Sequence, residues 1–139
     1  MSKPKPECRT AEEAEAAFYA AFSQCDLQAM QALWARDDVV CVHPGSAAIT
    51  GYEAVMRSWE HIFSNAERPM IRTKVIQCIA SEDLVLQMTE EYLSSPTNPS
   101  RGAVVLASNS YRRDAGGWSM VAHHASVMPV EQAQTRTLQ

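Results

Sequence analysis

Apolar residues recur at helical spacing in the first part of the chain. Between residues 11 and 24 they are Ala14, Ala17, Phe18, Ala21 and Phe22, a spacing that places them on one face of a helix. Thr10 and Glu13 form a capping box directly ahead of this run, which is a signal for a helix start. The pattern predicts an amphipathic helix over roughly residues 11–24.

Two more helices and a short strand are predicted before residue 70. Asp26 can cap a short helix whose apolar side carries Leu27, Met30, Leu33 and Trp34. The apolar residues 39–43 then predict a strand, which ends at His43 in front of Pro44. A second capping box, Thr50 to Glu53, opens a third helix, which is expected to end near Asn65. Its apolar stripe is Val55, Met56, Trp59, Ile62 and Phe63.

Strand-like segments replace the helical pattern after residue 70. Four of them are present: IRTKVIQCIA, LVLQMTEEYL, AVVLASNSYRR and WSMVAHHASVM, with the turns SED and DAGG in the chain between them. Helices followed by an antiparallel meander indicate an α+β fold. A twisted sheet of this size is expected to curl around the helices and to enclose a cavity.

Composition narrows the class of protein. The 139 residues fit one domain, with a flexible leader at 1–9, the domain at 10–129 and a polar tail at 130–139. The net charge of −4 argues against a nucleic-acid partner, and no apolar run is long enough for a membrane span. Cys8, Cys25, Cys41 and Cys78 lack metal-site spacing, so we expect no metal and no cofactor. Three of the four lie in apolar patterns and are expected to be reduced core thiols in a cytoplasmic protein.

The order of elements, together with three motifs, resembles a known superfamily. The motifs are WARDD before the strand at 39–43, HPGS and ITG after it, and the closing GWSMVAHHAS. They are similar to the nuclear-transport-factor-2-like superfamily, most of all to SnoaL-like domains and to the association domain of calcium/calmodulin-dependent kinase. The resemblance implies a conical, cystatin-like α+β barrel. Three helices would cover the concave face of a curved antiparallel sheet, a pocket would open into the cone, and the other sheet face would form a homodimer.

Ketosteroid isomerases of this superfamily allow a comparison at three positions. The family's general base, an Asp before a Pro, falls on His43, its oxyanion tyrosine falls on Phe18, and its second oxyanion donor falls on Ser108. The base position therefore keeps a titratable group, while Phe lacks a hydroxyl and Ser is a far weaker acid than a carboxyl group. The resemblance implies that the chain is not an intact ketosteroid isomerase.

His43 and His123 are the candidate catalytic residues. An imidazole can accept a proton at neutral pH, and a strand end can place His43 on a cavity wall; a structural histidine bonded to a carbonyl is the alternative. His123 and His124 face opposite sides of a strand, and matching to the kinase association domain implies that His123 faces the pocket and His124 the outer face. The candidate ligand-lining residues are Phe18, Tyr19, Trp34, Val55, Trp59, Met88 and Ser108.

Three functions remain open from the sequence. The first is a domain that binds a small apolar or aromatic molecule without strong catalysis. The second is an isomerase, dehydratase or cyclase that uses His43 as general base, with His123 or Ser108 steadying the oxyanion. The third is a dimeric assembly module with a vestigial cavity.

Overall fold

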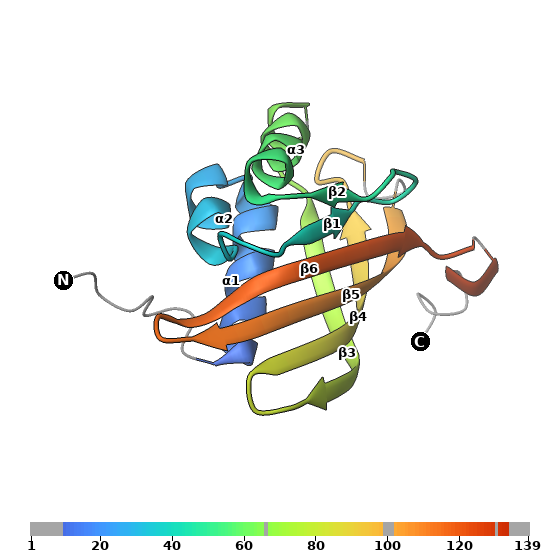
Figure 1. Cartoon of the computed structure of the whole chain (residues 1–139). Helices are drawn as coiled ribbons and strands as arrows, with labels where there is room; N and C mark the ends of the chain where they lie inside the picture. The colour runs from blue at the N-terminus through green and yellow to red at the C-terminus, as the bar shows by residue number, and fades with distance from the viewer. Residues whose placement is uncertain (1–9, 66, 99–101, 130, 134–139) are drawn as a thin grey trace.

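The structure is a computed structural model that describes residues 10–65, 67–98, 102–129 and 131–133. Apart from a helical turn at residues 131–133, the described residues form three helices and one six-stranded sheet (Figure 1). The helices are α1 (Ala11–Gln24), α2 (Leu27–Leu33) and α3 (Tyr52–Asn65). The strands are β1 (Val40–Val42), β2 (Ile49–Thr50), β3 (Met70–Ala80), β4 (Leu84–Ser94), β5 (Gly102–Asp114) and β6 (Gly117–Val127).

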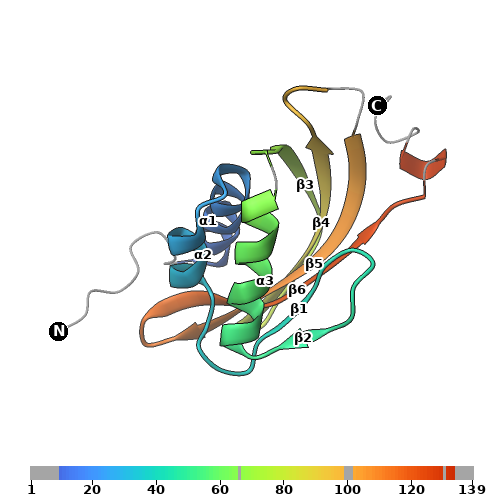
Figure 2. The ribbon, with the colours of Figure 1, turned by 90° about the horizontal axis from the view of Figure 1, so that it is seen from above.

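The sheet bends around the helices, which all lie on its concave side (Figure 2). Its strand order is β2-β1-β6-β5-β4-β3. The four long strands form the predicted antiparallel meander, which confirms the α+β class. Two details differ from the prediction. β1 pairs with β6 in parallel, and the loop after β1 returns as the short strand β2.

The first two predicted helix starts are confirmed, and the third is wrong. Thr10 accepts a hydrogen bond from the backbone of Glu13, and Asp26 accepts one from the backbone of Ala29. Thr50 instead belongs to β2, and Gly51 precedes α3 with a φ of 89°. That backbone conformation suits glycine because a side chain would be strained there.

The core lies between the helices and the concave face of the sheet. Its large, fully buried side chains include Phe18, Met30, Leu33, Trp34, Trp59, Tyr111, Met120 and His123. Two of the three thiols that we expected in the core differ: Cys25 is half-buried and Cys78 is exposed on β3, while Cys41 is buried.

A β-bulge near the closing hairpin sets which residues of β6 face the interior. Tyr111 pairs with Met120, but the next pair is Ser110 with Ala122, so that β6 has an extra residue at Val121. Because a one-residue shift turns every later side chain to the other face, Asn109 lies opposite His123. Ser108 consequently lies opposite His124.

The predicted leader and most of the predicted tail lie outside the described residues; residues 131–133 are helical. Among the described helices, none is long and apolar enough to cross a membrane.

Candidate functional site

Two imidazoles and an indole meet on the concave side of the sheet. The ring centroids of His43 and Trp59 are 4.8 Å apart, those of Trp59 and His123 are 5.8 Å apart, and those of the two imidazoles are 6.4 Å apart. Phe18 lies 4.9 Å from His123. Tyr19 in turn packs edge-on against Phe18 at 4.8 Å. The sequence therefore brings β1, α1, α3 and β6 together at one aromatic cluster.

His43 is half-buried just beyond the end of β1 and is held by α3. Its Nε2 lies 2.9 Å from Oγ of Ser58, and that hydroxyl lies 2.6 Å from the carbonyl oxygen of Val55. Because the single hydroxyl proton is donated to the carbonyl, Nε2 of His43 is the donor to Ser58. The lone pair of this imidazole is then on Nδ1. Burial lowers the pKa of His43, so the ring is neutral at pH 7.

Cys41 lies beside His43 but is not an activated nucleophile. Its Sγ is 3.6 Å from Nε2 of His43. Burial raises the pKa of the Cys41 thiol to about 12. Since the thiolate is the nucleophilic form, this pair does not form a Cys–His nucleophile at neutral pH.

His123 is almost fully buried and is fixed by Asn109. Its Nδ1 lies 2.7 Å from Oδ1 of Asn109, and only 2% of the residue's surface is exposed. Burial, and secondly the nearby His43 and His124, lower the pKa of His123 to about 3. This imidazole is therefore neutral throughout the physiological pH range.

The buried carboxylate of Glu15 accepts three hydrogen bonds next to the pair formed by His123 and Asn109. Glu15 of α1 accepts hydrogen bonds from Asn109 at 3.0 Å, Tyr111 at 2.6 Å and Thr89 at 3.1 Å. These partners are 74 to 96 residues away along the chain. Glu15 thus ties α1 to β4 and β5, and it holds the amide of Asn109 in place for His123.

A second buried carboxylate joins the same network through Tyr19. The hydroxyl of Tyr19 donates to Oε2 of Glu91 at 2.6 Å and accepts from Nδ2 of Asn109 at 2.9 Å. Burial raises the pKa of Glu91 to about 7; the hydrogen bond from Tyr19 opposes this rise, and the charge of Glu15 adds to it. Burial also raises the pKa of Tyr19 above its ordinary value, with Glu91 adding to the effect.

Trp59 contributes a donor that the protein does not use. Within the described part of the chain, its indole Nε1–H is buried and has no hydrogen-bond partner. Because buried polar groups are almost always paired, an orphaned donor beside two imidazoles points to a missing acceptor, such as a water or a ligand.

The structure separates the predicted ligand-lining residues into two groups. Phe18, Tyr19 and Trp59 belong to the aromatic cluster, and Val55 contributes the carbonyl that orients Ser58. Trp34 is wholly buried elsewhere, where its Nε1 donates to Sδ of Met30. We therefore assign Trp34 to the core.

The predicted inward orientation of Ser108 and Met88 is wrong. Their side chains contact each other at 3.5 Å across a directly opposed pair of β4 and β5. Asn109, the next residue of β5, reaches α1, and alternation therefore turns Ser108 to the outer face. The polar residue of β5 that faces the interior here is Asn109, whose side chain contacts Glu15 and His123.

Four polar residues of the site were not predicted as such: Glu15, Ser58, Glu91 and Asn109. For Glu15 a signal was present, because it lies three residues before Phe18 and seven before Phe22, on the apolar face of α1. Glu91 and Asn109 had no comparable signal. Each follows another polar residue, Glu90 or Ser108, on the opposite face of its strand. The sequence therefore does not show which residue of each pair faces the interior.

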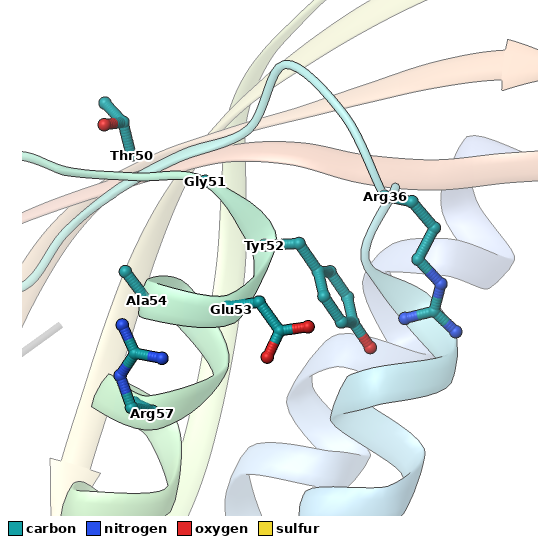
Figure 3. Close-up of a pocket in the computed structure, with 7 residues that line it drawn as sticks. All are labelled: Arg36, Thr50, Gly51, Tyr52, Glu53, Ala54 and Arg57. Carbon is teal, nitrogen blue, oxygen red and sulfur yellow. The ribbon is translucent and has the colours of Figure 1, made fainter.

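Two surface hollows lie away from this cluster. One of about 650 Å³ opens beside the first turn of α3 and is lined by Arg36, Thr50, Gly51, Tyr52, Glu53, Ala54 and Arg57 (Figure 3). In it the guanidinium of Arg36 stacks 4.2 Å above the ring of Tyr52. The other, of about 480 Å³, is lined by Glu67, Pro69, Leu93, Ser94, Ser95, Gly102 and Ala103. Neither hollow is lined by a predicted catalytic or ligand-lining residue.

Comparisons with known proteins agree with this architecture. The association-domain structure from Thiobacillus denitrificans, a candidate calcium/calmodulin-dependent protein kinase type II association domain, is 43% identical. It superimposes with a TM-score of 0.82 over 90% of this chain and 100% of its own. A candidate dehydratase of the NTF2-like family from Streptomyces avermitilis is 29% identical, with a TM-score of 0.79 over 92% of this chain and 100% of its own.

A plant relative is similar over only part of its length. F-box protein SKIP8 of Arabidopsis thaliana is 29% identical over 109 residues, which cover 78% of this chain. The chain spans less than half, 45%, of that relative.

A family model for the SnoaL-like domain matches residues 11–131, which include helices α1 to α3 and strands β1 to β6. The chain therefore belongs to the SnoaL-like domain family, on an NTF2-like fold.

Proposed function

We propose that this chain is a small-molecule-binding domain whose ligand lies against Trp59, His43 and His123. The observation that carries the proposal is the buried indole N–H of Trp59, which has no acceptor within the described residues and lies beside both imidazoles. Around it Phe18, Phe22 and Phe63 supply apolar ring surface. Apolar walls with a few fixed polar groups are typical of ligand sites.

Ligand binding is expected to depend on Trp59. Small aromatics of one or two rings should bind the protein in calorimetric titrations, and native mass spectrometry should find a retained molecule on fresh protein. Trp59→Phe keeps a ring but removes the N–H, so we expect affinity to fall about three- to tenfold. Trp118→Phe, far along β6, is the matched control and should bind normally. If no aromatic binds at millimolar concentration, the proposal is wrong.

A second candidate function is acid–base catalysis of the dehydratase or isomerase type. It is favoured by two neutral imidazoles that each donate one proton to a protein group, to Ser58 and to Asn109. The lone pair on Nδ1 of His43 is then able to take a proton from carbon. The Streptomyces avermitilis relative is named as a candidate dehydratase, which supports the same reaction class.

If His43 is a general base, the protein should accelerate exchange of a ketone's α-hydrogens. In this step a proton passes from the α-carbon of the ketone to Nδ1 of His43. That proton exchanges with D2O, and a deuteron returns to the α-carbon. With 2-tetralone as probe, proton NMR should show faster exchange than in buffer, and His43→Gln should lose at least about tenfold of it. His124→Gln, on the exposed imidazole, is the control. Exchange equal to that in buffer would reject this candidate.

We also propose that the outer face of the sheet forms a homodimer. Large apolar side chains are exposed there on three neighbouring strands: Ile79, Leu84 and Leu106. Leu106→Glu should therefore convert a two-chain mass in light scattering to a one-chain mass. Val75→Glu, which is exposed on the other face of β3, should leave the mass unchanged. A wild-type monomer at micromolar concentration would contradict this proposal.

The free thiols of Cys25, Cys41 and Cys78 support a cytoplasmic location.

A further inference from the structure

The protons of the interior network can be assigned from donor and acceptor counts. Both protons of the Asn109 amide nitrogen are donated, one to Glu15 and one to the hydroxyl of Tyr19. The amide oxygen is therefore the group that faces Nδ1 of His123 at 2.7 Å. Since a carbonyl oxygen only accepts, Nδ1 of His123 carries the proton.

This assignment fixes what His123 offers to a ligand. A neutral imidazole with its proton on Nδ1 has a lone pair on Nε2 and is an acceptor there. Protonation would convert Nε2 to a donor, but the pKa of His123 is about 3 because the ring is buried. Nε2 can therefore be satisfied only by a group that donates.

The charges of the interior disfavour a ligand that carries a carboxylate or an ammonium group. Among the described residues, the buried charged side chains that face the interior are Glu15 and Glu91, and no Lys or Arg is buried. A carboxylate ligand would enter a site with nearby like charges and no cation to pair with. An ammonium group would find the carboxylate of Glu15 already occupied by three neutral donors. That of Glu91 accepts from Tyr19.

Whereas His123 requires a hydrogen-bond donor on the ligand, Trp59 requires an acceptor. Its free N–H needs an acceptor, and it lies on the ring that contacts both imidazoles. A hydroxyl oxygen can satisfy both groups, because it donates one proton and accepts through its lone pairs.

We infer that the ligand is an uncharged aromatic molecule whose hydroxyl group donates to Nε2 of His123 and accepts from Nε1 of Trp59. The inference rests on the proposed binding function and adds the chemical class of the ligand. Asn109 and Glu15 are positioning residues in this scheme, since they act on the ligand through His123.

Four two-ring probes of equal ring size test the inference by calorimetry. They are 2-naphthol, 2-methoxynaphthalene, 2-naphthoate and 2-naphthylmethylamine, which is an ammonium ion at pH 7. We expect 2-naphthol to bind at least about tenfold more tightly than each of the others. His123→Phe, which keeps a ring without an acceptor, should remove the preference of 2-naphthol over 2-methoxynaphthalene. His124→Phe on the outer face is the matched control.

Wild-type protein gives an independent reading if His123→Phe does not fold. Addition of 2-naphthol should shift the ¹⁵N resonance of His123 Nε2 and leave that of His124 unchanged. Equal affinity for 2-methoxynaphthalene, tighter binding of the carboxylate or the ammonium probe, or an unmoved Nε2 resonance each overturns the inference while the binding function survives. If none of the four probes binds, both are wrong.

Discussion

Glu15→Gln is expected to lower the free energy of unfolding by about 2–3 kcal/mol at pH 7. The carboxylate of Glu15 accepts from Asn109, Tyr111 and Thr89 inside the protein. Glutamine replaces one of its two acceptor oxygens with an amide group that donates, so at least one buried donor loses its partner. Urea denaturation followed by circular dichroism measures the change.

Glu12→Gln is the matched control for this prediction. Glu12 precedes Glu15 by one turn on α1 and is exposed, so its substitution should change stability by no more than about 0.5 kcal/mol. Equal stability of Glu15→Gln and Glu12→Gln would mean that the three hydrogen bonds to Glu15 contribute nothing to folding.

Glu91→Gln is expected to have the opposite effect and to stabilise the protein above pH 7. Glu91 is buried, and its pKa is raised to about 7 from an ordinary value of 4.5. The folded protein consequently binds a proton between pH 4.5 and 7 that the unfolded chain has released. Wild-type stability therefore falls as pH rises through this window, by up to about 3 kcal/mol from this residue.

The uncharged amide that Glu91→Gln introduces carries no such pH dependence. The two proteins should have similar stability near pH 4.5, and Glu91→Gln should be the more stable one at pH 8, by up to about 3 kcal/mol. Taking the difference between them at each pH removes the contributions of His123 and His43. Those residues act in the other direction: their pKa values are lowered, so each reduces stability as the medium becomes acidic. A constant difference from pH 4.5 to 8 would show that Glu91 is ionised as readily in the folded protein as in the unfolded chain.

The helices and the strand order after residue 70 could be predicted because they are local properties. Helical spacing of Phe18 and Phe22 and the capping residues Thr10 and Asp26 each act within a few positions of the chain. The prediction was wrong at the third helix: Gly51, which has no side chain to act as a cap, directly precedes α3, and Thr50 belongs to β2.

Which side chain faces the interior could not be predicted for β5, because the chain there offers two polar residues in a row. Counting back from the turn at Asp114 pairs Ser108 with His123 and turns Ser108 inward. Tyr111 and Asn109 share the inner face of β5, and the bulge at Val121 shifts the register of β6 by one residue, so that His123 lies opposite Asn109. Such a bulge depends on the packing of β6 against β5 and α1, and no short sequence pattern reports it.

The hydrogen bonds that define the site join residues far apart in the chain. Tyr19 and Glu91 are 72 positions apart, and Glu15 and Tyr111 are 96 apart. Their pairing follows from how α1 lies across the sheet, and a hydrophobic pattern contains no information on that. His43 was found because an imidazole at a strand end, in front of a proline, is noticeable by itself, and His123 was found through the resemblance to the kinase association domain.

The proton on His123 is the most direct test of how this interior is organised. In a protein labelled with ¹⁵N-histidine, long-range proton–nitrogen spectra distinguish the two tautomers and follow their titration. The hydrogen-bond chain from Glu15 through Asn109 predicts a proton on Nδ1 of His123, a bare Nε2, and no titration between pH 5 and 8. A proton on Nε2, or an imidazole that titrates near pH 6.5, would contradict the account.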